Sequence, residues 1–224
     1  MDFSFVFTDG LATKINIVKL FLLLHTVLGC GFMKLWPEKR WKKIVLIAII
    51  AFVIVVASVS AFILFKINTD YVSEIEVLNA DGSETALIIY HPGFSSFMKD
   101  TVYAFADGLV ENGWRVEITT ASSQAPTDLS SYSLLALGSP VYAGSPSPTV
   151  KRHLERMGDL NGIETVLLVT SGGSDGSSEA SLQQAVEEHN GLVKNVLSLF
   201  TSIPNEGDGD PLDIAEQAGR EIFP

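Results

Sequence analysis

Residues 134–148 read LLALGSPVYAGSPSP, and this stretch decides the fold. The apolar run 134–137 contains no alternating polar residue, as expected for a strand of a parallel sheet that helices cover on both faces. It ends at Gly138 in a loop of serine, proline and glycine that holds one tyrosine, Tyr142, and an amphipathic segment follows. Ligands of open α/β sheets bind at the carboxyl ends of strands, so we expect this loop to lie at a ligand site.

Four other apolar runs repeat this pattern and predict strands over residues 86–90, 114–119, 165–170 and 196–201. Between them, apolar residues recur at helical spacing, for example over 149–157, and Asp210 before Pro211 is a start signal for a last helix. Strands that alternate with helices pair in parallel through right-handed crossovers. The sequence therefore predicts an α/β fold, a three-layer sandwich around a five-stranded parallel sheet, over residues 85–224.

Charge is divided unevenly along the 224 residues, whose formal net charge is −11. Residues 1–66 carry 8 Lys and Arg against 3 Asp and Glu, whereas residues 67–224 carry 7 against 23. Such an acidic body repels nucleic-acid backbones, so we expect no nucleic-acid partner. It suits basic protein partners, and it equally suits simple solubility.

Residues 44–65 contain no charged side chain. At about 1.5 Å per residue, this stretch spans roughly 33 Å as a helix, enough to cross a hydrocarbon core. We therefore predict a basic flank and transmembrane anchor over 33–66, followed by a linker over 67–84. A cleaved signal sequence is the alternative, but the run is long for one and no small-residue cleavage site ends it. The positive-inside rule keeps the basic flank cytoplasmic and predicts that the C-terminal domain of this single-pass protein lies outside.

The first 32 residues allow three interpretations. Met33 begins MKLWPEKRWKK, which is a complete basic region in front of an anchor, so residues 1–32 fit an over-extended gene start. Residues 15–32 could instead form a second membrane helix, although Asn16, Lys19 and His25 interrupt them. The third interpretation is a lipoprotein processing site that ends at Cys30.

Cys30 is the only cysteine, so disulfides, thiolate catalysis and cysteine metal sites are excluded for residues 67–224. The four histidines show no ligand spacing, and we expect no metal. His153 is predicted to be solvated on a polar helix face. His91 directly follows the first strand, and a loop histidine without a visible acid or nucleophile partner is more often structural than catalytic.

The stretch from Leu137 to Gly144 with the helix over 149–157 resembles the second flavin loop and following helix of flavodoxin-like proteins, and residues 170–173 (TSGG) are similar to their third loop. The resemblance covers residues 85–222. It implies a sheet of order 2-1-3-4-5 with FMN at the switch point between the first and third strands. The cofactor-binding residues that it implies are Gly93, Phe94, Ser95, Ser96, Ser139, Pro140, Val141, Tyr142, Ala143, Gly144, Thr170, Ser171, Gly172 and Gly173.

A flavin ring needs a flat slot, polar backbone atoms at one edge and an apolar face to stack on. Tyr142 offers that face, and Gly172 and Gly173 permit close backbone approach. By resemblance, a carbonyl near Ala143 or Gly144 would contact the ring nitrogen that gains a proton on reduction. The alternative is a tight turn without a ligand, in which Tyr142 only covers the sheet.

The phosphate loop departs from the family pattern. Flavodoxins surround a glycine with several hydroxyl residues at a helix N-terminus, where they bind the FMN phosphate. Here Gly93 with Ser95 or Ser96 can serve, but Pro92 lacks an N–H and His91 and Phe94 are bulky.

Other site types lack their motifs: the sequence contains neither G-x-G-x-x-G nor G-x-x-x-x-G-K-[ST], and Gly93 to Phe97 departs from the G-x-S-x-G motif of serine hydrolases at its last position. The sequence thus predicts a membrane-anchored flavoprotein that binds FMN and transfers electrons, as a carrier or as a quinone-directed oxidoreductase, with a redox protein or quinone as its partner. The alternative is a flavin-free binding or scaffold module tethered to the membrane.

Overall fold

A computed structural model of the chain describes residues 39–173, 176–202 and 209–224. The chain divides into two units, Met1–Ala61 and Phe62–Pro224. Helix α2 (Arg40–Asn68) contains the predicted span 44–65 and is long and apolar enough to cross a membrane, with a mean hydropathy of 3.1 over 18 residues and no buried residue. The predictions for residues 1–32 lie outside the described residues.

The second unit contains a sheet of order β1-β3-β2-β4-β6-β7. Five of these strands are parallel, namely β3 (Arg115–Thr120), β2 (Thr85–Tyr90), β4 (Leu134–Tyr142), β6 (Glu164–Ser171) and β7 (Leu192–Phe200). Numbered along the chain among themselves, they have the predicted order 2-1-3-4-5. The predicted α/β sandwich with a five-stranded parallel sheet of this order is therefore confirmed.

Two short strands were not predicted. Strand β1 (Glu76–Leu78) lies within the predicted linker over 67–84 and pairs antiparallel with β3 at the sheet edge. Strand β5 (Ser145–Pro146) pairs antiparallel with the end of β4. Strand β4 is also longer than the predicted run 134–137, because Gly138, Ser139 and Pro140 continue its ladder with β6. Much of the stretch predicted to be a loop is therefore strand.

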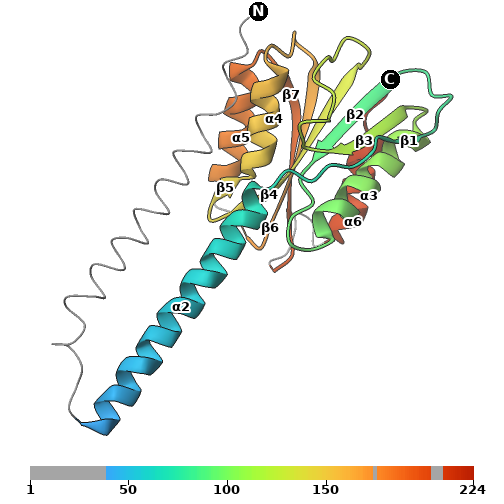
Figure 1. Ribbon diagram of the computed structural model, residues 1–224. Helices are drawn as coiled ribbons and strands as arrows, with labels where there is room; N and C mark the ends of the chain where they lie inside the picture. Colours follow the sequence, from blue (N-terminus) through green and yellow to red (C-terminus); the bar gives the residue numbers. More distant parts are fainter. Residues whose placement is uncertain (1–38, 174–175, 203–208) are drawn as a thin grey trace, which may run out of the picture. The chain divides into compact units, whose positions relative to one another are not determined.

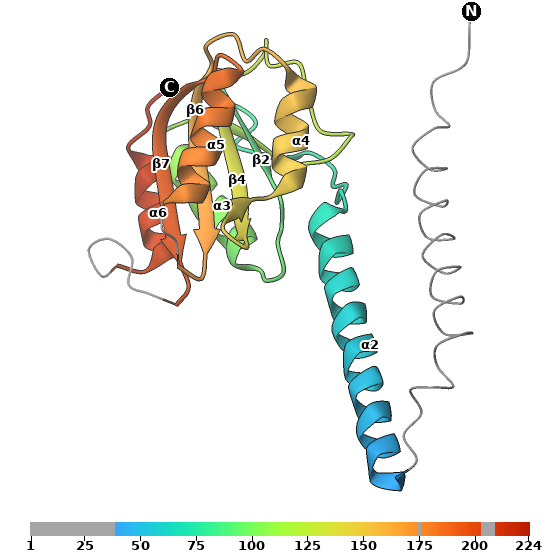
Figure 2. The same ribbon diagram turned by 90° about the vertical axis from the view of Figure 1, so that its left-hand side faces the viewer.

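The helices cover both faces of the sheet (Figures 1 and 2). Helices α3 (Phe97–Glu111) and α6 (Pro211–Arg220) lie on one face, and α4 (Pro148–Met157) and α5 (Ser177–Glu188) lie on the other. Side chains of one strand alternate between these layers: Ile88 belongs to the apolar core under α3 and α6, whereas Leu87 and Ile89 belong to the core under α4 and α5. Burial on both faces explains why the strands are continuous apolar runs.

Helices α3 and α6 approach each other closely at two glycines. A Cβ atom on Gly108 would lie 2.1 Å from the carbonyl oxygen of Glu216, and one on Gly219 would lie 2.2 Å from that of Phe105. Both positions therefore need glycine for its lack of a side chain. This contact fixes the two helices side by side, and each of them begins at the carboxyl edge of the sheet.

Candidate functional site

The three predicted loops meet at the carboxyl edge because they follow the neighbouring parallel strands β2, β4 and β6. We call residues 91–96 the first loop, residues 139–147, which include the end of β4 and all of β5, the second loop, and residues 171–173, which begin at the last residue of β6, the third loop. The first loop leads into α3 and the second into α4. The edge lies at the switch point between β2 and β4, where ligands of doubly wound sheets bind.

The first and second loops are in direct contact. Gly93 has φ +76°, and a Cβ atom there would lie 3.5 Å from Pro140 and 3.7 Å from the Tyr142 hydroxyl. Phe94, which is 55% exposed, packs edge-to-face on Tyr142, with ring centroids 5.5 Å apart at 82°. The Tyr142 ring, which the sequence assigned to flavin stacking, is therefore in contact with a side chain of the first loop.

His91, the first residue of the first loop, also contacts the second loop. Its side chain is buried, and its Nδ1 atom accepts a hydrogen bond from the Gly93 N–H at 3.2 Å and lies 3.2 Å from the Tyr142 hydroxyl. An accepting Nδ1 places the imidazole proton on Nε2, which has no hydrogen-bond partner among the described residues. Burial, with a smaller contribution from Lys66, lowers the pKa of His91 to about 4, so the imidazole is neutral at pH 7.

Two hydroxyl groups of the second loop, those of Ser139 and Ser147, have hydrogen-bond partners in the loop or at the start of α4. Ser139 Oγ accepts a hydrogen bond from the Ser147 N–H at 2.8 Å, and the Ser147 and Thr149 hydroxyl oxygens lie 2.8 Å apart. Ser139 and Pro140 are buried, whereas Val141 and Tyr142 are partly exposed. The loop reverses at Ala143 and Gly144, whose φ angles of +49° and +77° fit the two-residue turn of a tight hairpin. Hydrogen bonds and the tight turn thus fix the conformation of the second loop without a ligand.

The third loop presents backbone rather than side chains. Thr170 is buried in β6, Gly172 and Gly173 are exposed, and the Gly173 N–H donates to Ser171 Oγ at 3.2 Å. Helix α5 begins after this loop, and its Ser177 hydroxyl donates to the Gly144 carbonyl at 3.4 Å. The start of α5 therefore lies against the turn of the second loop.

Ser95 and Ser96 stand exposed at the start of α3. Ser96 is the residue before the helix, and its hydroxyl makes no capping hydrogen bond. Its carbonyl accepts the Asp100 N–H at 2.8 Å, so the helix itself is regular from there. Neither serine hydroxyl has a hydrogen-bond partner in the described parts of the chain. The first N–H groups of this 15-residue helix and two hydroxyls are available to an anion.

The prediction for His153 was wrong. This side chain is buried, its Nε2 donates to the Pro126 carbonyl at 3.0 Å, and its Nδ1 accepts from Arg156 at 3.1 Å. Burial and then the positive charge of Arg156 lower the pKa of His153. Val150 and Leu154 flank it on the buried side of α4, and the 3.6-residue period of those apolar residues could have revealed its orientation.

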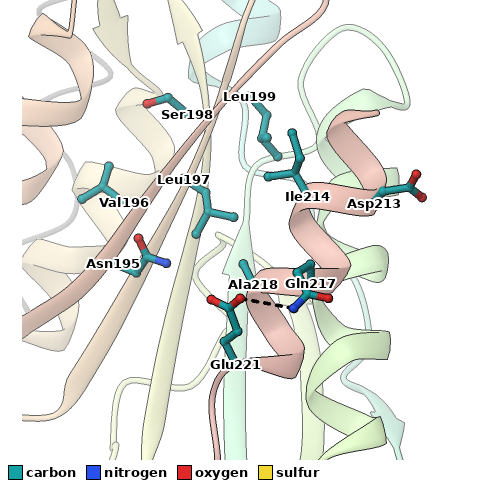
Figure 3. A pocket seen from close by; sticks show the side chains of 10 residues that line it. All are labelled: Asn195, Val196, Leu197, Ser198, Leu199, Asp213, Ile214, Gln217, Ala218 and Glu221. Atoms are coloured by element: carbon teal, nitrogen blue, oxygen red, sulfur yellow. Dashed lines mark hydrogen bonds between the residues drawn. The ribbon is translucent and has the colours of Figure 1, made fainter. Parts of the chain in front are cut away.

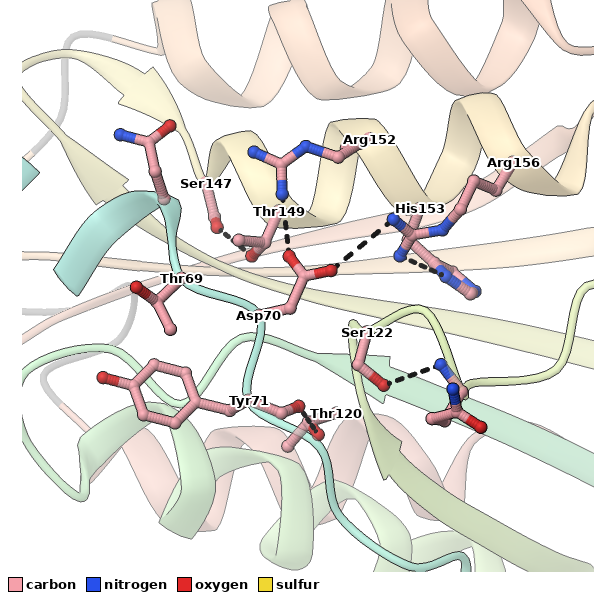
Figure 4. Close-up of polar contacts among 12 residues, drawn as sticks. Thr69, Asp70, Tyr71, Thr120, Ser122, Ser147, Thr149, Arg152, His153 and Arg156 are labelled. Atoms are coloured by element: carbon pink, nitrogen blue, oxygen red, sulfur yellow. Dashed lines mark hydrogen bonds and ion pairs between the residues drawn. The ribbon is translucent and has the colours of Figure 1, made fainter. Parts of the chain in front are cut away.

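Sequence analysis also missed the approach of residues 69–73 to this edge. Asp70 lies beside Arg152 and Arg156 of α4, and Tyr71 lies beside β3 (Figure 4). Asp70 and Arg152 are separated by 82 positions in sequence. The charge signs alone do not select this pair from the many acidic and basic residues, so no sequence signal could have found it.

Two cavities lie away from the three loops. One of about 490 Å³ lies between β7 and α6, where Leu197 and Ile214 face each other (Figure 3). The other, of about 610 Å³, is lined by residues that precede β4 and β6, among them Tyr132 and Asn161, and so lies at the amino edge of the sheet. Within residues 39–173, 176–202 and 209–224, no group of three or more His, Cys, Asp or Glu side chains could hold a metal ion.

Comparison with known proteins relates the chain to others by fold alone. No protein-family model matches the sequence, and no curated protein matches it either. Among solved structures, the chain is similar to the two-electron reduced flavodoxin of Megasphaera elsdenii, with a TM-score of 0.52, 15% identity, and coverage of 61% of this chain and 99% of the flavodoxin. A short-chain flavodoxin associated with a PDU bacterial microcompartment gives a TM-score of 0.50 at 14% identity, covering 61% of this chain and 94% of that one.

The flavodiiron core from Synechocystis is also similar, with a TM-score of 0.50 and 16% identity. The match covers 63% of this chain but 35% of the flavodiiron chain, so it concerns one part of that larger protein. These likenesses establish the flavodoxin-like fold of the second unit.

Proposed function

We propose that the domain after α2 binds FMN at the carboxyl edge of the sheet and passes electrons to a redox protein or a quinone. One observation carries this proposal: α3 begins at the switch point with two exposed serine hydroxyls and with no side-chain cap. A phosphate placed there would accept hydrogen bonds from Ser95, Ser96 and the helix N–H groups, with the helix dipole in its favour.

The second and third loops fit the ring of such a ligand. Tyr142 is partly exposed beside the Ala143–Gly144 turn, and the exposed Gly172 and Gly173 follow the neighbouring strand. A flavin that stacks on Tyr142 would lie beside the Phe94 ring or displace it. Phe94 is 55% exposed, so it can swing into solvent at a small cost in buried area.

The flavin would supply the electron transfer, and the chain would supply binding and field. Tyr142 would orient the ring by stacking, and burial that raises its pKa to about 12 keeps its hydroxyl neutral. The net negative charge of residues 67–224 disfavours the gain of negative charge by a bound flavin. We therefore expect a second reduction potential below that of free FMN, and a potentiometric titration that gives the free-flavin value would count against this.

A flavin-free binding or scaffold module is the second candidate. The contact between Phe94 and Tyr142 favours it, because Phe94 already packs against the ring that would stack on a flavin. Pro92 also removes one backbone N–H from the phosphate loop. The two candidates differ in whether the domain holds a chromophore.

The deciding experiment is a flavin titration of the full-length chain in lipid nanodiscs. FMN binding at the proposed site should quench FMN fluorescence at one equivalent per chain and give a yellow complex. Riboflavin, which lacks the phosphate, should bind more weakly. A colourless protein that leaves FMN fluorescence unchanged would favour the scaffold, and equal affinity for FMN and riboflavin would exclude a phosphate site at α3.

We also propose that α2 anchors the protein in a membrane, with the basic residues at its N-terminal end on the cytoplasmic side. The length and hydropathy of α2 support the anchor, and Lys39, Arg40, Lys42 and Lys43 support the orientation. Reporter fusions at the C-terminus test this, because a reporter active only outside the cytoplasm is expected. A fusion that is active in the cytoplasm would reverse the orientation.

A further inference from the structure

Residues 69–73, directly after α2, cross the carboxyl edge of the sheet beside the first and second loops, and we call them the strap (Figure 4). Two hydrogen-bonding groups of Thr120 hold the strap to the end of β3. The Thr120 hydroxyl donates to the Tyr71 carbonyl, and the Thr120 N–H donates to Ser73 Oγ at 3.0 Å. The strap is thus attached to the sheet by its backbone and by a side chain.

Asp70 attaches the strap to the other side of the site. Its carboxylate lies 2.7 Å from Arg152 Nη1 and 3.6 Å from Arg156 Nη1, and its side chain is 24% exposed. Figure 4 shows Asp70 directed toward α4, the helix that begins where the second loop ends. The ion pairs therefore hold the strap against the element that carries the second loop.

Tyr71 covers His91. The two ring centroids are 5.6 Å apart at an interplanar angle of 66°, and the Tyr142 ring lies 5.9 Å from His91 on a further contact at 85°. The imidazole is therefore packed against one tyrosine of the strap and one of the second loop, and only 1% of His91 is exposed. Burial of this kind disfavours the charged imidazole.

The lone pair on Nδ1 of the neutral His91 accepts the Gly93 N–H within the first loop, and the same atom lies 3.2 Å from the Tyr142 hydroxyl of the second loop. If water reached the ring, its pKa would return toward 6.5 and protonation would convert Nδ1 into a donor. The Gly93 N–H would then face another N–H. The conformation of the first loop at Gly93, and the direction of the hydrogen bond to Tyr142, thus depend on what keeps water from the imidazole.

We propose that the strap positions the first two loops of the site, with Tyr71 as the cover of His91 and Asp70 as the latch on α4. Asp70 and Tyr71 are positioning residues that act through His91. The consequence for flavin affinity rests on the proposed function, whereas the effect on His91 does not. The strap directly follows α2 in the sequence. Displacement of the strap would therefore change the loops that it contacts.

The test uses the sign of the change in the His91 pKa. The charged groups that face His91 are Asp70, which raises its pKa, and Lys66, which lowers it, while burial lowers it most. In Asp70→Asn, loss of the negative charge alone would lower the pKa of His91. Release of the strap would instead admit water and raise that pKa toward 6.5. The two outcomes therefore have opposite signs.

The measurement is a histidine NMR titration of the full-length chain in lipid nanodiscs, with the His91 signal assigned from His91→Asn. We expect Asp70→Asn to raise the pKa of His91 by about one unit or more. Asp107→Asn, which removes an exposed carboxylate on α3, is the matched control and should leave it unchanged. A value that is unchanged or lower in Asp70→Asn would overturn the role of Asp70 as a latch.

Tyr71 provides a second pair of variants. Tyr71→Phe keeps the ring over His91 and should retain the low pKa, whereas Tyr71→Ala removes the cover and should raise it. The backbone amide spectrum establishes that each variant is folded. An unchanged His91 pKa in folded Tyr71→Ala would overturn the cover. FMN binding is measured in a separate titration. A protein that shows these shifts in the pKa of His91 without binding FMN would support the positioning role of the strap and contradict the proposed FMN binding.

Discussion

Helices α3 and α6 pack together on one face of the sheet and begin at the same edge, but their N-termini differ. At α6, Pro211 follows Asp210, whose carboxylate accepts the Leu212 N–H at 2.8 Å. At α3, Ser95 and Ser96 are exposed, and no side chain caps the helix. At α6 the Asp210 side chain satisfies one N–H group of the helix, whereas at α3 no side chain does so.

This difference separates stability from binding. The first N–H groups of any helix lack partners within that helix, and a capping carboxylate satisfies one of them at a gain of about 1 kcal/mol. Helix α6 has this stabilisation, whereas α3 lacks it. Helix α3 begins at the switch point of the sheet, where a bound anion would supply the missing hydrogen-bond acceptors. The comparison predicts that changes at the two ends affect different measurements.

Gly108→Ala should have the largest effect, because it disrupts the contact that α3 and α6 share. The added methyl group would meet the Glu216 carbonyl at 2.1 Å, where backbone must move. We expect a loss of about 3 kcal/mol in the free energy of unfolding, measured by urea denaturation. Asp107→Ala on the exposed side of the same helix should change it by less than about 0.5 kcal/mol. Equal effects would mean that the helices are not held by this contact.

Ser95→Ala with Ser96→Ala removes both hydroxyls from the open end of α3. If the FMN phosphate lies there, FMN affinity should fall about 30-fold, or about 2 kcal/mol, while riboflavin affinity stays constant. The free energy of unfolding should not change, because neither hydroxyl has a partner in the described chain. Ser83→Ala, at the opposite edge of the sheet, is the control. Retention of full FMN affinity in the double variant would place the phosphate elsewhere.

Asp210→Ala tests the closed end. We expect it to destabilise the domain by about 1 kcal/mol without changing flavin affinity. Asp210→Asn keeps a capping oxygen and should cost only a few tenths of that. Thermal denaturation of the two variants separates the hydrogen bond from the charge, and identical losses would show that the charge alone matters.

Ser96→Asp makes the open end more like the closed one. A carboxylate beside the helix dipole should stabilise α3 by about 0.5 kcal/mol, and it should repel the FMN phosphate. We therefore expect a small rise in the melting temperature together with loss of FMN binding and retention of riboflavin binding. A variant that binds FMN like the original chain would contradict the assignment of this helix end.

The fold could be predicted from the sequence because its main signals are local. Apolar runs such as 134–137 mark strands that are buried on both faces, and Asp210 before Pro211 marked the start of α6 correctly. The short strands β1 and β5 were missed, since three residues and two residues carry too little pattern to stand out. They form because a neighbouring strand offers unpaired backbone groups.

The candidate site was predictable only in its location. The order of parallel strands brings the three loops to one edge, but it does not say which side chains bond within the loops. Ser139 was proposed for the flavin, and its hydroxyl is occupied by the Ser147 N–H. His91 carried no visible partner in the sequence, and its contact with Tyr142 joins residues 51 positions apart.

The order of residues alone therefore determined an acidic α/β domain of five parallel strands behind a long apolar helix, because burial periodicity and hydropathy act over a few neighbouring residues. Tertiary structure decided which polar groups were left over for a ligand. Packing brought Asp70 to Arg152, Tyr71 to His91 and Phe94 to Tyr142, and it left Ser95 and Ser96 without partners in the described chain. Hydrogen bonds and ion pairs depend on positions within a few ångströms, which only the folded backbone defines.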